Sequence, residues 1–183
     1  MAGIGSSSAT TSPHMADNTE ILASIRAEAS RIEEDTTHSS CGHFEACKPW
    51  AHLNLWLGIP VTVAAAVGGF TALKDEPAVA SLISFAVAAG TAMMTFLAPR
   101  ERHNLHADCG NAYSSLRNEV RVFRNIECQL GTPIAELHKR LQEFAKRRDE
   151  LNATSPIIPE RAFKRARRGI EEGQKTHQVD RKP

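Results

Sequence analysis

Two long stretches without charged residues lie almost back to back near the middle of this chain. Residues 51–73 and 78–98 contain no Asp, Glu, Lys or Arg, and only Lys74-Asp75-Glu76-Pro77 separates them. A membrane-spanning helix needs about 20 mostly apolar residues to cross roughly 30 Å of hydrocarbon. Each stretch is long enough, and a turn this short makes the two helices antiparallel neighbours. We predict a transmembrane hairpin at residues 50–98, with helices at 50–73 and 78–98.

The alternative is a soluble bundle in which both apolar helices are buried on every side. The flanking segments would then have to cover the hairpin completely. They are too rich in charge for that role, because nearly all of the 22 basic and 21 acidic side chains lie in them. We therefore favour an all-α integral membrane protein.

The basic residues close to the apolar stretches predict the orientation in a membrane, because they stay on the cytoplasmic side. The turn contains one, Lys74, whereas the flanks contain Lys48, Arg100, Arg102, Arg117, Arg121 and Arg124. Both termini are therefore predicted to be cytoplasmic. The four cysteines do not form a secreted disulfide framework, which agrees with a reducing compartment.

The flanks divide into segments by composition. Residues 1–16 are rich in Gly, Ser and Thr and are expected to be disordered. Residues 17–49 are predicted to form a cytoplasmic amphipathic helix, but its segment 36–47 contains the weak helix formers Thr36, Thr37, Ser39, Ser40 and Gly42. That part is either a break or a continuation of the helix into the membrane. The apolar stripe of this helix consists of Ile21, Leu22, Ile25, Ala29 and Ile32.

Residues 99–173 are predicted to be a cytoplasmic helical region, followed by a polar tail at 174–183. Two apolar stripes in this region have the alternating spacings of three and four that are typical of coiled coils and bundles. The first stripe is Leu105, Cys109, Ala112, Leu116, Val120 and Phe123, and the second is Ile134, Leu137, Leu141, Phe144 and Leu151. We expect the N- and C-terminal helices to form an oligomeric bundle.

Small and hydroxyl-bearing residues share one face of the second apolar helix. They are Ser81, Ser84, Ala88, Thr91 and Thr95. In lipid, helices associate through close packing at small residues and through hydrogen bonds between helices, which favours a homo-oligomer. The face is then either a packing face or the lining of a water-filled pore made by several subunits, and the pattern does not decide between them.

His and Cys residues lie close together in the sequence on both sides of the hairpin. His38, Cys41, His43 and Cys47 precede it, and His103, His106 and Cys109 follow it. These spacings do not fit a standard zinc site, so we expect no metal. His103 and His106 are candidates for the inner mouth of a pore, or for ordinary contacts between helices.

The sequence contains none of the signals of a common enzyme class. It has no glycine-rich phosphate loop and no nucleophile elbow, so we expect no catalytic residue and no cofactor. An enzyme with a membrane anchor is the least favoured alternative.

Two segments resemble a known family in detail. The first is Arg102-His103-Asn104-Leu105-His106, followed by Ala112-Tyr113, Leu116 and Glu119, and the second is Pro156-Ile157-Ile158-Pro159-Glu160, followed by Phe163 and Ala166. Together with the layout of residues 18–173, they resemble the SLATT family, two-transmembrane effectors associated with bacterial nucleotide-sensing conflict systems.

The resemblance implies an oligomeric pore in the bacterial inner membrane that stops phage by killing or arresting the host. It also implies a nucleotide or oligonucleotide ligand made by a partner nucleotidyltransferase. We take a tetramer as the expected assembly, and a non-conducting membrane scaffold as the alternative function.

The basic stretch between Lys139 and Arg168 has three interpretations. It is a solvated helical face, a surface for anionic lipid headgroups, or a site for a phosphate-rich ligand, because Arg pairs well with phosphate. Under the third interpretation, the ligand-binding candidates are Arg140, Arg147, Arg161, Lys164 and Arg165.

Overall fold

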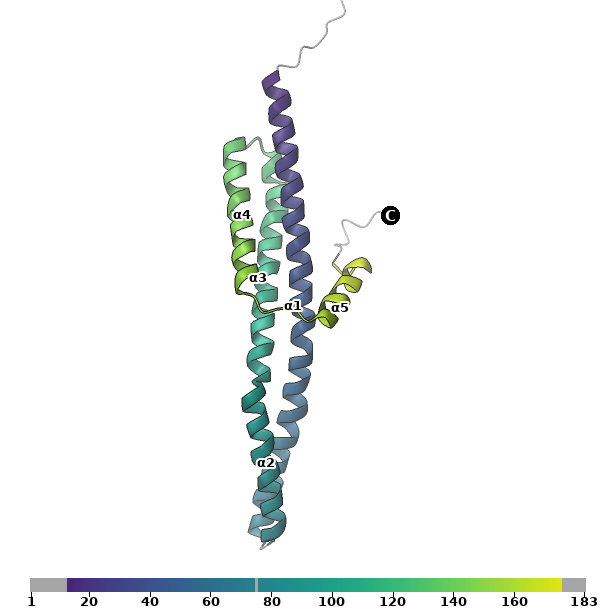
Figure 1. The fold of residues 1–183 in the computed structure, drawn as a ribbon, viewed down its shortest axis with the longest axis vertical. Helices are drawn as coiled ribbons and strands as arrows, with labels where there is room; N and C mark the ends of the chain where they lie inside the picture. The colour runs from purple at the N-terminus through teal and green to yellow at the C-terminus, as the bar shows by residue number, and fades with distance from the viewer. Residues whose placement is uncertain (1–12, 75, 176–183) are drawn as a thin grey trace, which may run out of the picture. The chain divides into compact units, whose positions relative to one another are not determined.

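The computed structural model describes residues 13–74 and 76–175, and this part of the chain is all-α (Figure 1). Two of its helices are long and apolar enough to cross a membrane. The elements are α1 (Pro13–Leu73), α2 (Pro77–Leu97), α3 (Pro99–Asn125), the 3-10 helix η1 (Glu127–Gln129), α4 (Ile134–Thr154) and α5 (Glu160–Glu171).

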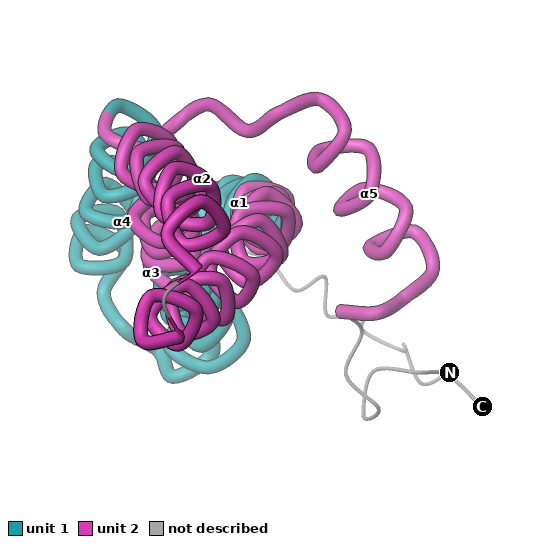
Figure 2. Tube along the Cα trace, turned by 90° about the horizontal axis from the view of Figure 1, so that it is seen from below, with its two compact units in different colours: residues 1–37, 114–153 teal, residues 38–113, 154–183 magenta. Residues whose placement is uncertain are grey.

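The chain forms two compact units, each built from segments that are distant in sequence (Figure 2). Unit 1 comprises residues 1–37 and 114–153, and unit 2 comprises residues 38–113 and 154–183. The start of α1, the end of α3 and most of α4 therefore belong to unit 1. The remainder of α1, all of α2, the start of α3 and α5 belong to unit 2.

Unit 1 has an apolar core where α1, α3 and α4 meet. Phe123 of α3 is fully buried and meets Phe144 of α4 edge to face, with 5.4 Å between the ring centroids. The spacing of the core residues explains why these segments are helical, because positions three and four apart share one helix face. The core consists of Ile25, Ala29, Ile32, Leu116, Val120, Phe123, Cys128, Leu137, Leu141 and Phe144.

Polar contacts join the same helices around this core. The Arg26 guanidinium donates to the Cys128 carbonyl at 2.6 Å, and Arg124 donates to Ser30 at 3.1 Å and pairs with Glu33 at 3.2 Å. Hydrogen bonds that involve a charged group contribute more to stability than neutral ones. These contacts fix the positions of α1 and α3 in unit 1 along their axes.

In unit 2, α1 and α2 pack as antiparallel neighbours along the apolar hairpin, by which we mean residues 50–73 of α1 and 77–97 of α2. Gly58 faces Met94, Val61 faces Gly90, and Gly68 faces Ile83. A Cβ atom at Gly68 would lie 2.8 Å from Cγ2 of Ile83, so only glycine allows this close approach. Close approach at small residues is the usual way for helices to associate in lipid.

A break at Ala98 separates α2 from α3. Ala98 has the left-handed backbone conformation, with φ of 44°, and it is followed by Pro99. Proline has no amide hydrogen and disfavours a helical conformation in the residue before it. The second apolar helix therefore ends at Leu97, one residue before the end given in the sequence analysis.

The segment at residues 36–47 is helical throughout, so α1 continues through it without a break. Thr36, Ser40 and His43 are buried and extend the stripe of Ile25, Ala29 and Ile32. Helix α1 begins at Pro13, before the expected start at residue 17, and residues 1–12 lie outside the described part.

The predicted stripe of α3 is correct in its second half only. Leu116, Val120 and Phe123 are buried, but Leu105 is 50% exposed. In the first half of α3, the buried positions are instead His106, Gly110 and Tyr113. The predicted stripe of α4 is confirmed at its centre, where Leu137, Leu141 and Phe144 are buried.

The unit 1 core predicts the cost of truncating its largest ring. Phe123→Ala should lower the free energy of unfolding by about 3–5 kcal/mol, because it removes buried apolar surface and leaves a cavity. The measurement is denaturant unfolding of the purified protein, followed by circular dichroism. Val122→Ala is the matched control, since Val122 is 44% exposed. Equal effects of the two variants would contradict this core.

Candidate functional site

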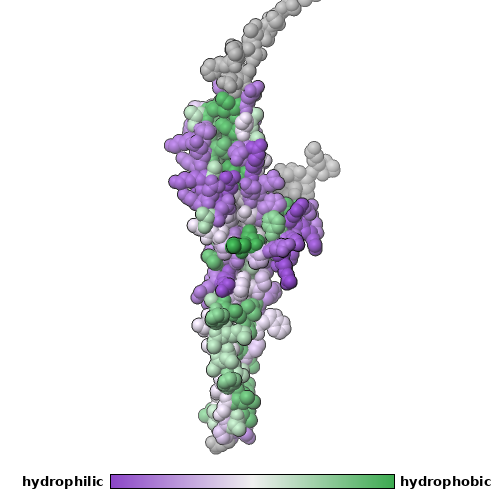
Figure 3. All heavy atoms as spheres, viewed as in Figure 1, coloured by the Kyte–Doolittle hydropathy of each residue, from purple (hydrophilic) through white to green (hydrophobic). Residues whose placement is uncertain are grey.

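The apolar hairpin is almost uncovered by the rest of the chain. In the most apolar segment of the first long helix, 6% of the residues are buried. In the corresponding segment of the second long helix, no residue is buried. Large apolar side chains such as Leu73, Phe85 and Phe96 are 84%, 75% and 87% exposed. Figure 3 shows green and white side chains on the visible face of the hairpin, whereas the visible parts of α4 and α5 are mostly purple. An apolar surface of this extent indicates a lipid or protein partner.

The predicted pore-lining face of α2 lies beside the face that packs on α1. Each candidate follows a partly buried residue by one position, which rotates it about 100° around the helix axis. Ser81, Ser84, Ala88, Thr91 and Thr95 thus follow Ala80, Ile83, Val87, Gly90 and Met94, and all five candidates are exposed. The face is therefore free of contacts that would bury it within one chain.

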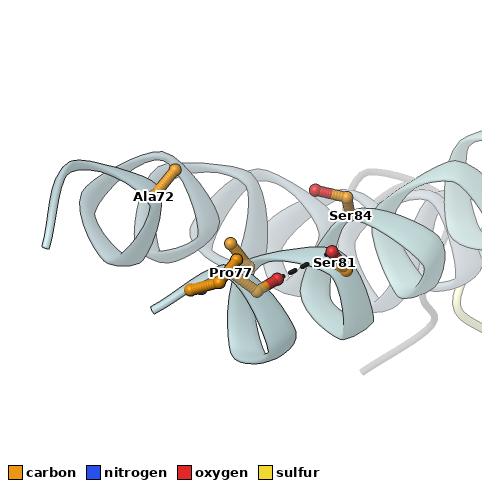
Figure 4. Close-up of a pocket in the computed structure, with 5 residues that line it drawn as sticks. Ala72, Pro77, Ser81 and Ser84 are labelled. Atoms are coloured by element: carbon orange, nitrogen blue, oxygen red, sulfur yellow. Dashed lines mark hydrogen bonds between the residues drawn. The ribbon is translucent and has the colours of Figure 1, made fainter. Parts of the chain in front are cut away.

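Two hydroxyl groups of this face already have partners in their own helix. Ser81 donates to the Pro77 carbonyl at 2.7 Å, and Thr95 donates to the Thr91 carbonyl at 3.0 Å. Ser81 and Ser84 line an open hollow of 630 Å³ near the hairpin turn together with Ala72, Pro77 and Ala80. Figure 4 shows the side chains of Ser81 and Ser84 and the hydrogen bond from Ser81 to Pro77. The hydroxyls can therefore face apolar or aqueous surroundings, since their hydrogens are satisfied.

A buried polar layer connects α1 and α3 in unit 2, and it consists of Ser40, His43, His106 and Tyr113. The Nδ1 atoms of His43 and His106 are 3.0 Å apart, so one ring donates and the other accepts. The His43 ring also stacks on Tyr113, with 5.6 Å between centroids and an angle of 15°. Ser40 donates to the Gly110 carbonyl at 3.0 Å. Buried polar groups are costly unless they are paired, so this layer fixes the register of the two helices.

Both histidines of this layer are held in the neutral form. Burial, together with a smaller contribution from the neighbouring His106, lowers the pKa of His43 to about 4. Burial lowers the pKa of His106 as well. Only one hydrogen fits between the two Nδ1 atoms, so protonation of the accepting ring would place two N–H groups against each other.

The two pore-mouth candidates lie in contacts between helices of one chain. His106 is 7% exposed within the buried polar layer, and His103 places Nδ1 3.0 Å from the Cys47 carbonyl. A role at the mouth of a pore remains a prediction for both. In the described residues, no group of three His, Cys, Asp or Glu side chains is placed to hold a metal ion.

The five ligand-binding candidates fall into two groups, and most of them are paired with carboxylates. In unit 1, Arg140 pairs with Glu127 at 3.4 Å, and Arg147 donates twice to Glu119, which lowers the pKa of that carboxyl.

On α5 of unit 2, Lys164 pairs with Glu160 at 2.6 Å and Arg165 with Glu45 at 3.2 Å, while Arg161 is exposed. This pairing favours a solvated face for most of them, and the ligand role remains a prediction.

No family model, no curated protein and no solved structure matches the chain. The resemblance to the SLATT family therefore remains a prediction, and function has to be proposed from the geometry.

The sequence interpretation missed the buried polar layer as a unit. In the sequence, His43 and His106 belong to two separate His/Cys groups, with His106 a pore-mouth candidate, and Ser40 and Tyr113 have no predicted site role. The available signal was spacing, because positions 36, 40 and 43 continue the helical stripe of Ile25, Ala29 and Ile32.

The lowered pKa values predict a loss of stability in acid. Between pH 6.5 and about 4 the unfolded chain binds protons that the folded chain does not. The free energy of unfolding therefore decreases as the pH is lowered through this range. For His43 the loss is at most about 3 kcal/mol. The measurement is denaturant unfolding at several pH values.

His43→Leu should flatten this slope, whereas His138→Gln should not, because His138 is exposed. The same slope in wild type and His43→Leu would contradict the assignment.

Proposed function

We propose that the apolar hairpin spans a membrane with both termini on the cytoplasmic side, and that several copies assemble into an ion-conducting pore. The observation that carries this proposal is the exposure of the hairpin together with the hydroxyl face of α2 beside its packing face. Lipid would cover the outward face of Leu82, Phe85 and Phe96. A second copy would cover much of what remains.

The pore lining in this proposal is Ser81, Ser84, Ala88, Thr91 and Thr95. Their small side chains leave room for water, and carbonyl-bonded hydroxyls keep lone pairs for ions and water. Since the resemblance stated above implies a pore-forming effector, the function that fits best is depolarisation of the bacterial inner membrane, leading to growth arrest or death during phage infection. A tetramer is the expected assembly.

A scaffold without conductance is the second candidate. The hydrogen bonds of Ser81 and Thr95 within α2 favour it, because hydroxyls satisfied in their own helix also suit a dry packing face. In that case the same five residues would form the contact between subunits, with no water between them.

Control by a nucleotide or oligonucleotide, made by a partner nucleotidyltransferase, rests on the family resemblance alone. Such a ligand changes the pore only if it binds two packings of the helices with different affinity. The buried polar layer could switch between two such packings, because a shift of α1 along α3 would break its hydrogen bonds together and form a new set.

Substitution of the pore face separates the two candidates. Thr91→Leu and Ser84→Leu place bulky apolar side chains where the proposal puts water, so ion flux from proteoliposomes should fall about tenfold or more while the oligomer persists. Ala89→Leu is the matched control, because Ala89 is exposed on the outward face of α2 with Phe85 and Phe96.

Flux is measured with a potential-sensitive dye, and the oligomer by light scattering in detergent. Unchanged flux in Thr91→Leu, or wild-type protein that assembles and never conducts, would contradict the pore and favour the scaffold.

A further inference from the structure

A groove in unit 2 lies between α1 and α5, close to the start of the apolar hairpin. It encloses 310 Å³, and its α1 side includes Phe44, Glu45 and Lys48. Its α5 side includes Arg165, and the residues after α5 add Gln174 and Lys175. None of these residues belongs to the pore face or to the buried polar layer.

The charges in this groove are unbalanced. Glu45 is the only carboxylate among the described lining residues, and it is shared by Lys48 and by Arg165, whose Nε lies 3.2 Å away. Burial raises the pKa of Glu45, but the hydrogen bonds and charges of Lys48 and Arg165 outweigh burial and lower it. Lys175 lies over the Phe44 ring, 5.8 Å from its centroid, and has no carboxylate partner among the described residues. Three cations thus surround one carboxylate.

The end of α5 explains why a lysine faces this groove. Gly173 has φ of 77°, its amide donates to the Ile170 carbonyl at 2.9 Å, and the Gln174 amide donates to the Gly169 carbonyl at 3.0 Å. This pattern is a Schellman motif, in which the residue with positive φ is nearly always glycine. It turns the chain back, so that Gln174 and Lys175 lie on the groove rather than continuing along the α5 axis.

We infer that this groove binds a phosphate group through Arg165 and Lys175. A planar guanidinium beside an ammonium is a typical phosphate site. The Phe44 ring supplies an apolar wall for the group attached to the phosphate. The ligand is therefore a phosphomonoester or phosphodiester, from a lipid headgroup or from a free nucleotide.

The position of the groove makes the lipid source the first to test. Lys48 lies two residues before Trp50, whose ring is covered by the Arg102 guanidinium at 5.0 Å from its centroid. Tryptophan and arginine are typical of the headgroup level of a membrane. This part of the inference rests on the proposed membrane insertion, whereas binding of a free phosphate does not.

The experiment compares the full chain in nanodiscs of two compositions. With phosphatidylglycerol in the disc, native mass spectrometry counts the anionic lipids that the wild type retains. With phosphatidylcholine alone, calorimetry follows titration with inorganic phosphate and with a linear dinucleotide. Arg165→Gln with Lys175→Gln should weaken whichever ligand binds about tenfold or more, because two charge-assisted contacts are lost.

Two further variants keep the result independent of folding. Lys146→Gln with Arg167→Gln removes the same charge from exposed sites paired with Glu150 and Glu171, and should leave binding unchanged. Glu45→Gln removes the competing carboxylate and should strengthen binding about threefold or more. A misfolded protein would not gain affinity.

Retention of phosphatidylglycerol that depends on Arg165 and Lys175 supports the groove with a lipid ligand. Binding of phosphate or dinucleotide that depends on the same pair supports it with a free ligand. No binding in either disc would overturn the inference, as would equal losses in the groove variant and the control variant. None of these readouts requires conductance. The experiment can therefore support phosphate binding in the groove when the pore proposal is wrong, and it can reject phosphate binding when the pore proposal is right.

Discussion

The antiparallel pairing of α1 with α2 and the start of α3 is the constraint on which unit 2 depends. The contacts keep one register, from Gly68 with Ile83 near the turn to Cys47 with His103 and His43 with His106. A turn of a few residues sets this register, and close approach at Gly68 maintains it. This register also sets the positions of the groove on α1 and of the exposed face of α2, because the opposite face of each helix packs against its neighbour.

The two ends of this helix pair follow opposite rules of burial. Near the turn, apolar side chains are exposed, and the helices touch through small residues. Around His43 and His106, polar side chains are buried and bonded to one another. In water this distribution would be unfavourable at the apolar end, because large apolar side chains would remain exposed to solvent. In a membrane, lipid would cover these side chains. The physical chemistry of unit 2 is thus consistent only with partners for the hairpin, which we propose are lipid and further copies of the chain.

Much of the fold was predictable from the sequence. The absence of charge over two stretches predicts the two apolar helices, and the spacing of Leu137, Leu141 and Phe144 predicts the core face of α4. The buried polar layer was not predicted, because hydrophobic periodicity detects only apolar residues, and Ser40, His43, His106 and Tyr113 occupy the buried positions there. The groove was also missed, since Phe44 and Lys175 are more than 100 positions apart in the sequence and meet only through the turn after α5.

The central claim is that α2 faces lipid on one side and water or another subunit on the other. Nitroxide scanning of residues 78–97, after replacement of the four native cysteines, measures it through the accessibility of each label to oxygen and to a water-soluble nickel complex in proteoliposomes. The account predicts that oxygen accessibility peaks at residues 82, 85, 89, 93 and 96, and that nickel accessibility peaks at 81, 84, 88, 91 and 95. High nickel accessibility at every position would contradict insertion, and low nickel accessibility along the second set would contradict a water-filled pore.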